Sequence, residues 1–250
     1  DRQIPTKLKE PGYVRRVQWD DEQFKKLHTH FAAKTHGCLY RNNLAWEEYF
    51  RWDEDDTMVA IYYNEDDEPC GYMVYLISSD VMHIKELIYL KREAQLGLWE
   101  YIHAHDSMID EVRGNNYYSE PIAFELDDSD IKETIRPYAM GRIIDVAQFI
   151  SQYNCDPDGP GGCSFEIEDE LLPWNNGTFV IDFEKGHCAL TDKKPQYHIS
   201  MSIGTFTTLL LGYKSAEKLL QMGKIQTTYD AVAKLDDILY HEIPYVSDYI

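Results

Sequence analysis

Three closely spaced apolar segments, at residues 57–63, 71–78 and 83–90, constrain the fold of this chain most strongly. They read "TMVAIYY", "GYMVYLIS" and "HIKELIYL", and they are rich in the β-branched and aromatic residues that strands favour. The acidic turn "NEDDEPCG" joins the first two segments. The pattern therefore predicts three consecutive strands.

The elements predicted on either side of these strands suggest a fold class. A short strand is expected at residues 13–19, and Asp20 or Asp21 can cap a helix that stops at Gly37. A second helix, "NLAWEEYFRW", follows at residues 43–52.

After the three strands, a long helix is expected from about Lys91 to Val112, with Met108 and Ile109 on its buried face. The segment "PIAFEL" at 121–126 is expected to form the next strand. The resulting order is strand, two helices, three strands, helix, strand. This is the element order of an acetyltransferase fold of the GNAT type.

The pattern changes in the second half of the chain. A charged stretch at 127–137 ends at a proline and predicts a domain boundary. Beyond it we expect a short helix, two strand pairs around the turn "PWNNG", and mainly helices after residue 204. With 250 residues and 44% apolar content, two packed domains are expected.

Charge and cysteine content restrict the partners and the compartment. The formal net charge of −20 argues against binding to nucleic acid or to an anionic membrane surface, and favours a cationic small molecule. The sequence has no run of eighteen apolar residues. Five cysteines make no disulfide framework, so a reducing cytoplasm is expected. The polar opening segment without an initiator Met predicts a fragment whose N-terminal part is missing.

The junction at residues 91–98 is where a GNAT fold binds the pyrophosphate of CoA. That site requires Gln or Arg, two residues, Gly, one residue, then Gly or Ala, because backbone N–H groups of a tight turn bind the phosphates. Neither Arg92 nor Gln95 starts this spacing, Glu93 would repel a phosphate, and Gly97 falls inside the helix. The sequence predicts that CoA does not bind here.

No metal site is predicted. Asn154, Asp156 and Asp158 match the spacing of a calcium loop, but its twelfth place is Phe165 and not Glu, so a flexible surface loop is expected. The pairs His28/His30 and His103/His105 each lie about 200° apart on a helix and cannot share a metal ion. These histidines are expected at the surface or in an interface.

Four segments together resemble the Eis-like (enhanced intracellular survival) family of GNAT N-acetyltransferases. They are "GYVRRV", "HGCLYRNNLAWEEYF", "GRIIDVAQFI" and a tail from "LLLGYKSAEKLLQMGKI" to "PYVSDYI". The resemblance implies an α+β fold: a degenerate GNAT-like domain with a mixed sheet, then an α/β sandwich domain like sterol carrier protein. The implied division is a linker at 1–12, a first domain at 13–130 and a second at 136–250.

The same resemblance implies a role for the C-terminal segment "PYVSDYI". In such proteins the terminal carboxylate reaches the active site of a catalytic domain and acts as general base, which would make Ile250 catalytic through its main chain and Tyr249 a substrate-binding residue. Acetyl-CoA would be bound by the missing N-terminal domain. The acceptor would be a cationic amine, such as a polyamine, a lysine-like compound or an aminoglycoside. From the residues alone, the tail could instead pack on its own domain.

Two rival interpretations remain open from the sequence. Sterol-carrier-like folds can hold apolar ligands in a tunnel, although polar residues alternate along 164–172 and 177–186 and favour strands with one apolar face. Both domains could also serve only structure and assembly. A homo-oligomer is expected from the resemblance and from the aromatic-rich segment "AWEEYFRW".

Overall fold

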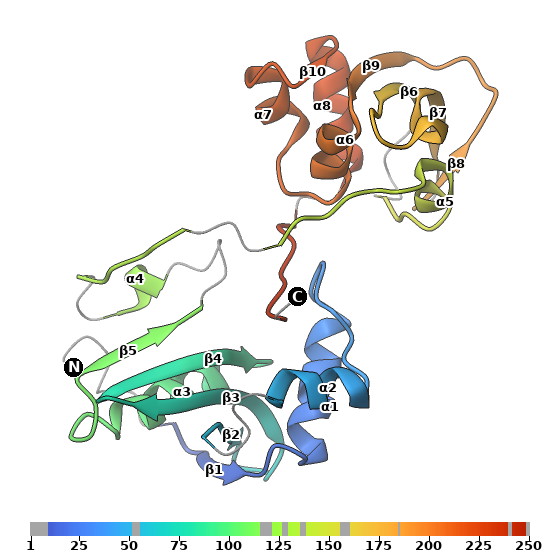
Figure 1. Cartoon of the computed structure of the whole chain (residues 1–250). Coiled ribbons are helices and arrows are strands. Elements are labelled where there is room, and N and C mark those ends of the chain that lie inside the picture. The colour runs from blue at the N-terminus through green and yellow to red at the C-terminus, as the bar shows by residue number, and fades with distance from the viewer. Residues whose placement is uncertain are drawn as a thin grey trace. The chain divides into compact units, whose positions relative to one another are not determined.

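The structure is a computed structural model that describes residues 10–51, 56–115, 122–126, 130–135, 139–155, 161–184, 186–239 and 242–248. The chain forms two compact units (Figure 1). The first comprises Asp1–Pro137 together with Tyr245–Ile250, and the second comprises Tyr138–Pro244. This differs from the expected second domain at 136–250, because the segment from Tyr245 onward belongs to the first unit.

The first unit is built on a five-stranded sheet in the order β1-β2-β3-β4-β5. Neighbouring strands are antiparallel except β4 and β5, which are parallel. The strands are β1 Tyr13–Val17, β2 Met58–Tyr63, β3 Pro69–Ser78, β4 Val81–Tyr89 and β5 Glu111–Gly114. The predicted strands at 57–63, 71–78 and 83–90 are thus confirmed as β2 to β4.

Helices cover both faces of this sheet. They are α1 Glu22–Ala32, α2 Asn43–Phe50 and α3 Arg92–His103, whereas the short α4 Ile122–Glu125 buries none of its residues. The side chains of Asp21 and Asn42 cap α1 and α2. One core joins α1 and α2 to one sheet face, and a second core joins α3 to the other. Because both faces are covered, β2 and β3 are apolar at successive positions rather than at alternate ones.

Two predicted elements are wrong. The helix expected to reach Val112 ends at His103, and Val112 lies in β5. Ile109 is buried in the core under α3, as expected, but it lies beyond the helix, and Met108 and Val112 are exposed. The strand expected at 121–126 is the helix α4 over its described residues, and its Glu125 bonds to Arg92 at the start of α3.

A bulge in β4 places a carboxylate in the core. Val74 pairs with Glu86 and Tyr75 with Ile84, so Lys85 is an extra residue in the ladder. The extra residue shifts the alternation by one position. Glu86 therefore lies on the same sheet face as Val74, which packs in the core with α1 and α2.

The second unit has its own five-stranded sheet, in the order β10-β9-β6-β7-β8, with β6 and β9 parallel. Its strands are β6 Gly161–Glu168, β7 Gly177–Glu184, β8 His187–Leu190, β9 Tyr197–Ser202 and β10 Ile225–Gln226. Its helices are α5 Val146–Ile150, η1 (3-10) Pro173–Asn175, α6 Ile203–Leu210, α7 Ala216–Gln221 and α8 Tyr229–Ile238. Alternate residues of β6, Cys163, Phe165 and Ile167, enter a single apolar core.

Among the helices of the described residues, none combines the length and apolar character needed to cross a bilayer. The fold class is mixed α and β in both units, as the sequence predicts.

Candidate functional site: the α3 junction and the C-terminal segment

The junction between β4 and α3 already holds a carboxylate. Arg92 Nη1 donates to Glu125 Oε2 at 2.7 Å, and Gln95 Nε2 donates to the same oxygen at 3.0 Å. Lys91, which precedes the helix, makes no side-chain cap. The side chains of Arg92 and Gln95 at this helix start are therefore engaged by Glu125 of α4, and Glu93 adds a further negative charge to the first turn.

Gly97 serves the packing of Tyr62. A Cβ at Gly97 would lie 2.2 Å from Tyr62 Cε2, far inside contact distance. Tyr62 is 1% exposed and belongs to the core under α3. The glycine thus lies inside α3 and allows an aromatic ring to approach the helix.

The segment Tyr245–Asp248 packs on the first unit. Tyr245 N–H donates to the His36 carbonyl at 2.9 Å, and the Tyr245 ring meets Phe31 of α1 edge to face. Residues 242–248 form no helix or strand, so these contacts and the side chains of Ser247 and Asp248 hold the segment. We call residues 245–248 the C-terminal arm.

The arm binds a buried ion pair between Arg41 and Glu86. Arg41 Nη1 and Nη2 donate to the two oxygens of Glu86 at 3.0 and 2.9 Å. Arg41 Nε donates to Asp248 Oδ1 at 2.6 Å, and Nη2 donates to Ser247 Oγ at 3.1 Å. Ser247 Oγ in turn donates to Glu86 Oε1 at 2.6 Å. Every member of this network has a named partner on another segment of the chain.

Aromatic rings and a tyrosine hydroxyl enclose the pair. The Arg41 guanidinium carbon lies 4.6 Å from the ring centre of Trp46 and 4.3 Å from that of Tyr49, both on α2. Tyr72 donates its hydroxyl to Glu86 Oε2 at 2.6 Å. The side chains of Arg41 and Glu86 are 1% and 0% exposed, so water screens this pair very little.

The electrostatics keep both members charged. Burial alone would raise the pKa of Glu86, but the charge and hydrogen bonds of Arg41 outweigh it and hold this pKa below its usual value. Burial alone would lower the pKa of Arg41, and the Glu86 charge outweighs that effect and raises it. The pair is therefore ionised throughout the neutral range.

The histidines expected at a surface or interface include two that are buried, which corrects that expectation. His28 is 0% exposed and packs edge-on against Trp46. Burial, followed by the Arg41 charge, lowers the pKa of His28 to about 4, so it is neutral at pH 7. His105 is 7% exposed, and its Nδ1 lies 2.8 Å from the Tyr101 carbonyl oxygen while its Nε2 lies 3.0 Å from Arg16 Nη2.

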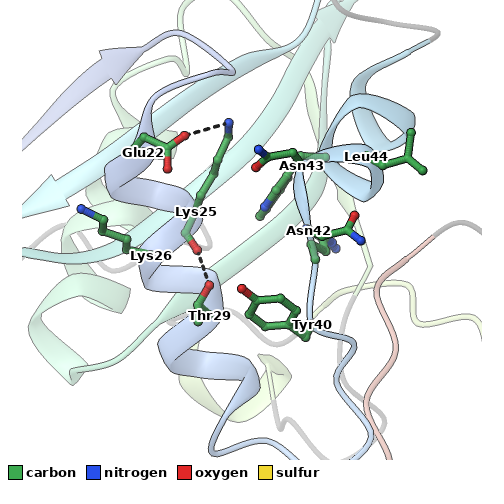
Figure 2. A pocket seen from close by; sticks show the side chains of 10 residues that line it. Glu22, Lys25, Lys26, Thr29, Tyr40, Asn42, Asn43 and Leu44 are labelled. Carbon is green, nitrogen blue, oxygen red and sulfur yellow. Dashed lines mark hydrogen bonds and ion pairs between the residues drawn. The ribbon is translucent and has the colours of Figure 1, made fainter.

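A polar groove of about 670 Å³ lies beside the ion pair, between α1 and the start of α2. Figure 2 shows Lys25 and Thr29 on α1 facing Tyr40 and Asn43 across this groove. Lys25 donates to Glu22 at 3.3 Å and lies 5.7 Å from the Trp19 ring centre, so its charge is already partly balanced. Arg41 also lines the groove.

Several residues singled out from the sequence lie outside the described residues: Ile250, Tyr249, Asp156 and Asp158. Within the described part of the chain, no group of three or more His, Cys, Asp or Glu side chains could hold a metal ion. The aromatic-rich segment expected at an interface contributes Trp46 and Phe50 to the core, at 2% and 1% exposure.

The sequence reasoning missed Arg41 and Glu86. One signal was present: Glu86 is an acidic residue within the apolar run "HIKELIYL". A charged residue in a buried strand needs a partner. Which cation would supply that partner could not be read from the sequence, because Arg41 and Glu86 are 45 positions apart.

Comparison with known proteins identifies both halves of the chain. Residues 37–143 match the model of the acetyltransferase (GNAT) domain, and residues 146–247 match that of the sterol carrier protein domain. A comparison with curated proteins finds no match.

Three solved structures cover almost the whole chain. A probable N-acyltransferase of unknown function from Enterococcus faecalis is 26% identical with a TM-score of 0.91, covering 99% of this chain and 64% of its own. A GCN5-related N-acetyltransferase from Anabaena variabilis is 22% identical with a TM-score of 0.83. The match covers 99% of this chain and 66% of the Anabaena protein. Eis1 from Mycobacterium abscessus is 17% identical with a TM-score of 0.76, covering 100% and 65%.

This chain thus spans slightly less than two thirds of the length of these relatives. The last two likenesses concern the fold alone. Taken with the two sheets and the helices around them, the matches show a GNAT domain over residues 37–143 followed by a domain like sterol carrier protein over residues 146–247.

Proposed function

We propose that this chain is the C-terminal part of an N-acetyltransferase that moves an acetyl group from acetyl-CoA to the amine of a cationic acceptor. The observation that carries the proposal is the pairing of the two matched domains with a C-terminal arm held on the first of them. The acceptor class rests on the net charge of −20, which attracts polyamines, lysine-like compounds and aminoglycosides.

In this proposal acetyl-CoA binds to a further domain outside these 250 residues. The α3 junction supports this division, because Glu125 engages Arg92 and Gln95 where a pyrophosphate would bind. Relatives about half as long again as this chain leave room for such a domain. The chain on its own would then be inactive.

The general base in this proposal is the main-chain carboxylate of Ile250, with Tyr249 beside the acceptor. An amine is mostly protonated at neutral pH and must lose a proton before it attacks the thioester carbonyl. A terminal carboxylate has an ordinary pKa of about 3.5, and apolar neighbours raise it toward a useful basicity. The assignment holds for a chain that ends at Ile250.

The test is acetyl transfer by the complete enzyme. CoA thiol release is measured with a polyamine, a lysine derivative and an aminoglycoside, for the parent enzyme and for a form with two residues added after Ile250. The proposal predicts turnover by the parent and a loss of about 10²- to 10⁴-fold in kcat on extension, the range of a general base. Equal kcat values for the two forms would rule out the carboxylate, and no turnover with any amine would rule out the reaction.

A lipid-binding function has less support. The hydrophobic side chains of the second unit, including Phe165, Phe183 and Phe206, pack together in one cluster and are 0% exposed. Self-association remains a prediction, and light scattering at micromolar concentration tests it.

A further inference from the structure

We propose that Arg41 and Glu86 are positioning residues for the C-terminus of this chain: together they form a receptor on the GNAT-like domain that fixes Ser247 and Asp248. This inference rests on the proposed function, because it gives the arm a catalytic purpose. It also makes a claim about binding within the chain that can be tested without catalysis.

Contacts that do not involve the arm already hold Arg41 and Glu86 in place. Two parallel hydrogen bonds join Arg41 to Glu86, and Tyr72 holds the carboxylate from β3. The rings of Trp46 and Tyr49 fix the guanidinium plane. A bidentate Arg–carboxylate pair of this kind restricts direction as well as distance. Any group bound to it takes a defined place.

The arm completes this receptor. Arg41 Nε and one hydrogen of Nη2 do not bond to Glu86, and these are the donors that bind Asp248 and Ser247. Ser247 bridges the pair by donating to Glu86. A loop, a strand and the arm thus meet at one buried point, and the contacts to the arm use hydrogen-bonding capacity that the Arg41–Glu86 pair itself leaves over.

The distance along the chain makes this receptor relevant to chemistry. Asp248 lies two residues before Ile250, and two residues of extended chain span at most about 7 Å. A base must come within about 2.6–3.2 Å of the proton that it takes, and a misplacement of 1 Å can cost about 100-fold in rate. Fixing Asp248 therefore limits where a carboxylate at Ile250 can go.

The variants that test this inference are made on the arm, because a change at Arg41 or Glu86 leaves a buried charge without its partner and endangers the fold. Asp248→Asn and Ser247→Ala weaken the contacts to Arg41 while the Arg41–Glu86 pair stays intact. Asp192→Asn is the matched control, since it makes the same chemical change at an exposed loop residue.

Hydrogen exchange of peptide 242–248 is measured first, in the 250-residue chain. The Tyr245 amide, which donates to His36, is expected to exchange at least about 10-fold faster in Asp248→Asn than in the parent or in Asp192→Asn. If all three exchange alike, the receptor does not hold the arm and the inference fails, whatever the enzyme's activity.

Kinetics of the complete enzyme follow. For Asp248→Asn we expect kcat to fall about 10- to 100-fold with an unchanged KM for acetyl-CoA, and the acidic limb of the kcat–pH profile to shift, because the base samples other surroundings. A purely structural contact would leave that limb in place. If extension after Ile250 lowers kcat but the arm variants do not, the positioning inference alone fails. If neither changes kcat, the proposed base fails as well.

Discussion

Two arginines of the first unit, Arg92 and Arg41, both bind a carboxylate, yet their surroundings differ. The side chains of Arg92 and Glu125 are 54% and 27% exposed at the start of α3, whereas those of Arg41 and Glu86 are 1% and 0% exposed. An exposed pair contributes about 0–1 kcal/mol, because water and salt screen it. A buried pair adds little net stability as a unit, but removing one member is strongly destabilising because the other charge stays buried without its partner.

The two arginine–carboxylate pairs therefore have different consequences at the α3 junction and at the C-terminal arm. At the α3 junction, no Gly-rich turn presents backbone N–H groups, and Glu125 engages the side chains of Arg92 and Gln95. At Arg41, a carboxylate in the core leaves directed donors over for the C-terminal arm. The first arrangement pairs two side chains at an exposed helix start, and the second joins the buried pair to Ser247 and Asp248 of the same chain.

The largest expected effect comes from breaking the buried pair. Arg41→Met should reduce the free energy of unfolding of the first unit by about 3–5 kcal/mol, because Glu86 is left charged and buried. Arg92→Met should cost about 1 kcal/mol or less. Urea unfolding followed by tryptophan fluorescence in a Trp174→Phe background reports the first unit, since Trp174 belongs to the second. Equal losses for the two variants would show that the buried and the exposed pair do not differ in this way.

The stability of the first unit should fall on acidification because His28 is buried. Burial lowers the pKa of His28 to about 4 from the 6.5 expected in the unfolded chain. Between these values the unfolded chain binds a proton that the folded chain does not, so stability falls as the pH falls, by about 3 kcal/mol from pH 6.5 to pH 4.

Paired substitutions isolate this contribution. Between pH 6.5 and pH 4, the free energy of unfolding of His28→Phe should fall by about 3 kcal/mol less than that of the parent. His30→Phe, at an exposed position of the same helix, should show the same pH dependence as the parent. Parallel curves for the parent and both variants would show that His28 does not titrate as described.

Gly97→Ala tests whether α3 is shaped for an aromatic ring. The added methyl group would overlap Tyr62, so we expect a loss of about 1–3 kcal/mol in the stability of the first unit. Adding Tyr62→Leu should recover part of the loss, because the smaller side chain gives room. A Gly97→Ala variant as stable as the parent would mean that the ring and helix are not in contact.

The smallest effect is expected at Glu125. Glu125→Gln should change the free energy of unfolding by less than about 1 kcal/mol, and it should not create binding of acetyl-CoA, because no Gly-rich turn presents backbone N–H groups there. Thermal melts with and without acetyl-CoA measure both quantities. A melting temperature raised by acetyl-CoA in this variant alone would show that one carboxylate blocks an otherwise working site.

The fold of the first unit was largely predictable, and the exceptions have physical causes. Apolar runs and caps defined β2 to β4 and the first two helices, because these signals are local. The predicted helix after β4 was too long. Met108 and Val112 have helical spacing, but both are exposed and lie beyond the end of α3. Residues 122–125 have strand-like composition, and they form a helix whose Glu125 pairs with Arg92.

The site was less predictable than the fold. The absence of a Gly-rich turn at 91–98 could be read directly, and the structure adds Glu125 as a residue that engages Arg92 and Gln95 there. The Arg41 receptor depends on a bulge at Lys85 and on contacts between segments 45 and 207 positions apart. Tertiary contacts at such separations leave no periodicity in a single sequence.

The most direct measurement is a calorimetric titration of acetyl-CoA into the 250-residue chain. If the α3 junction has no CoA site, no saturable binding is expected up to about millimolar acetyl-CoA, where a Kd of 1 mM corresponds to only about −4.1 kcal/mol. A micromolar Kd that Arg92→Met abolishes would contradict this prediction, because acetyl-CoA would then bind at the α3 junction.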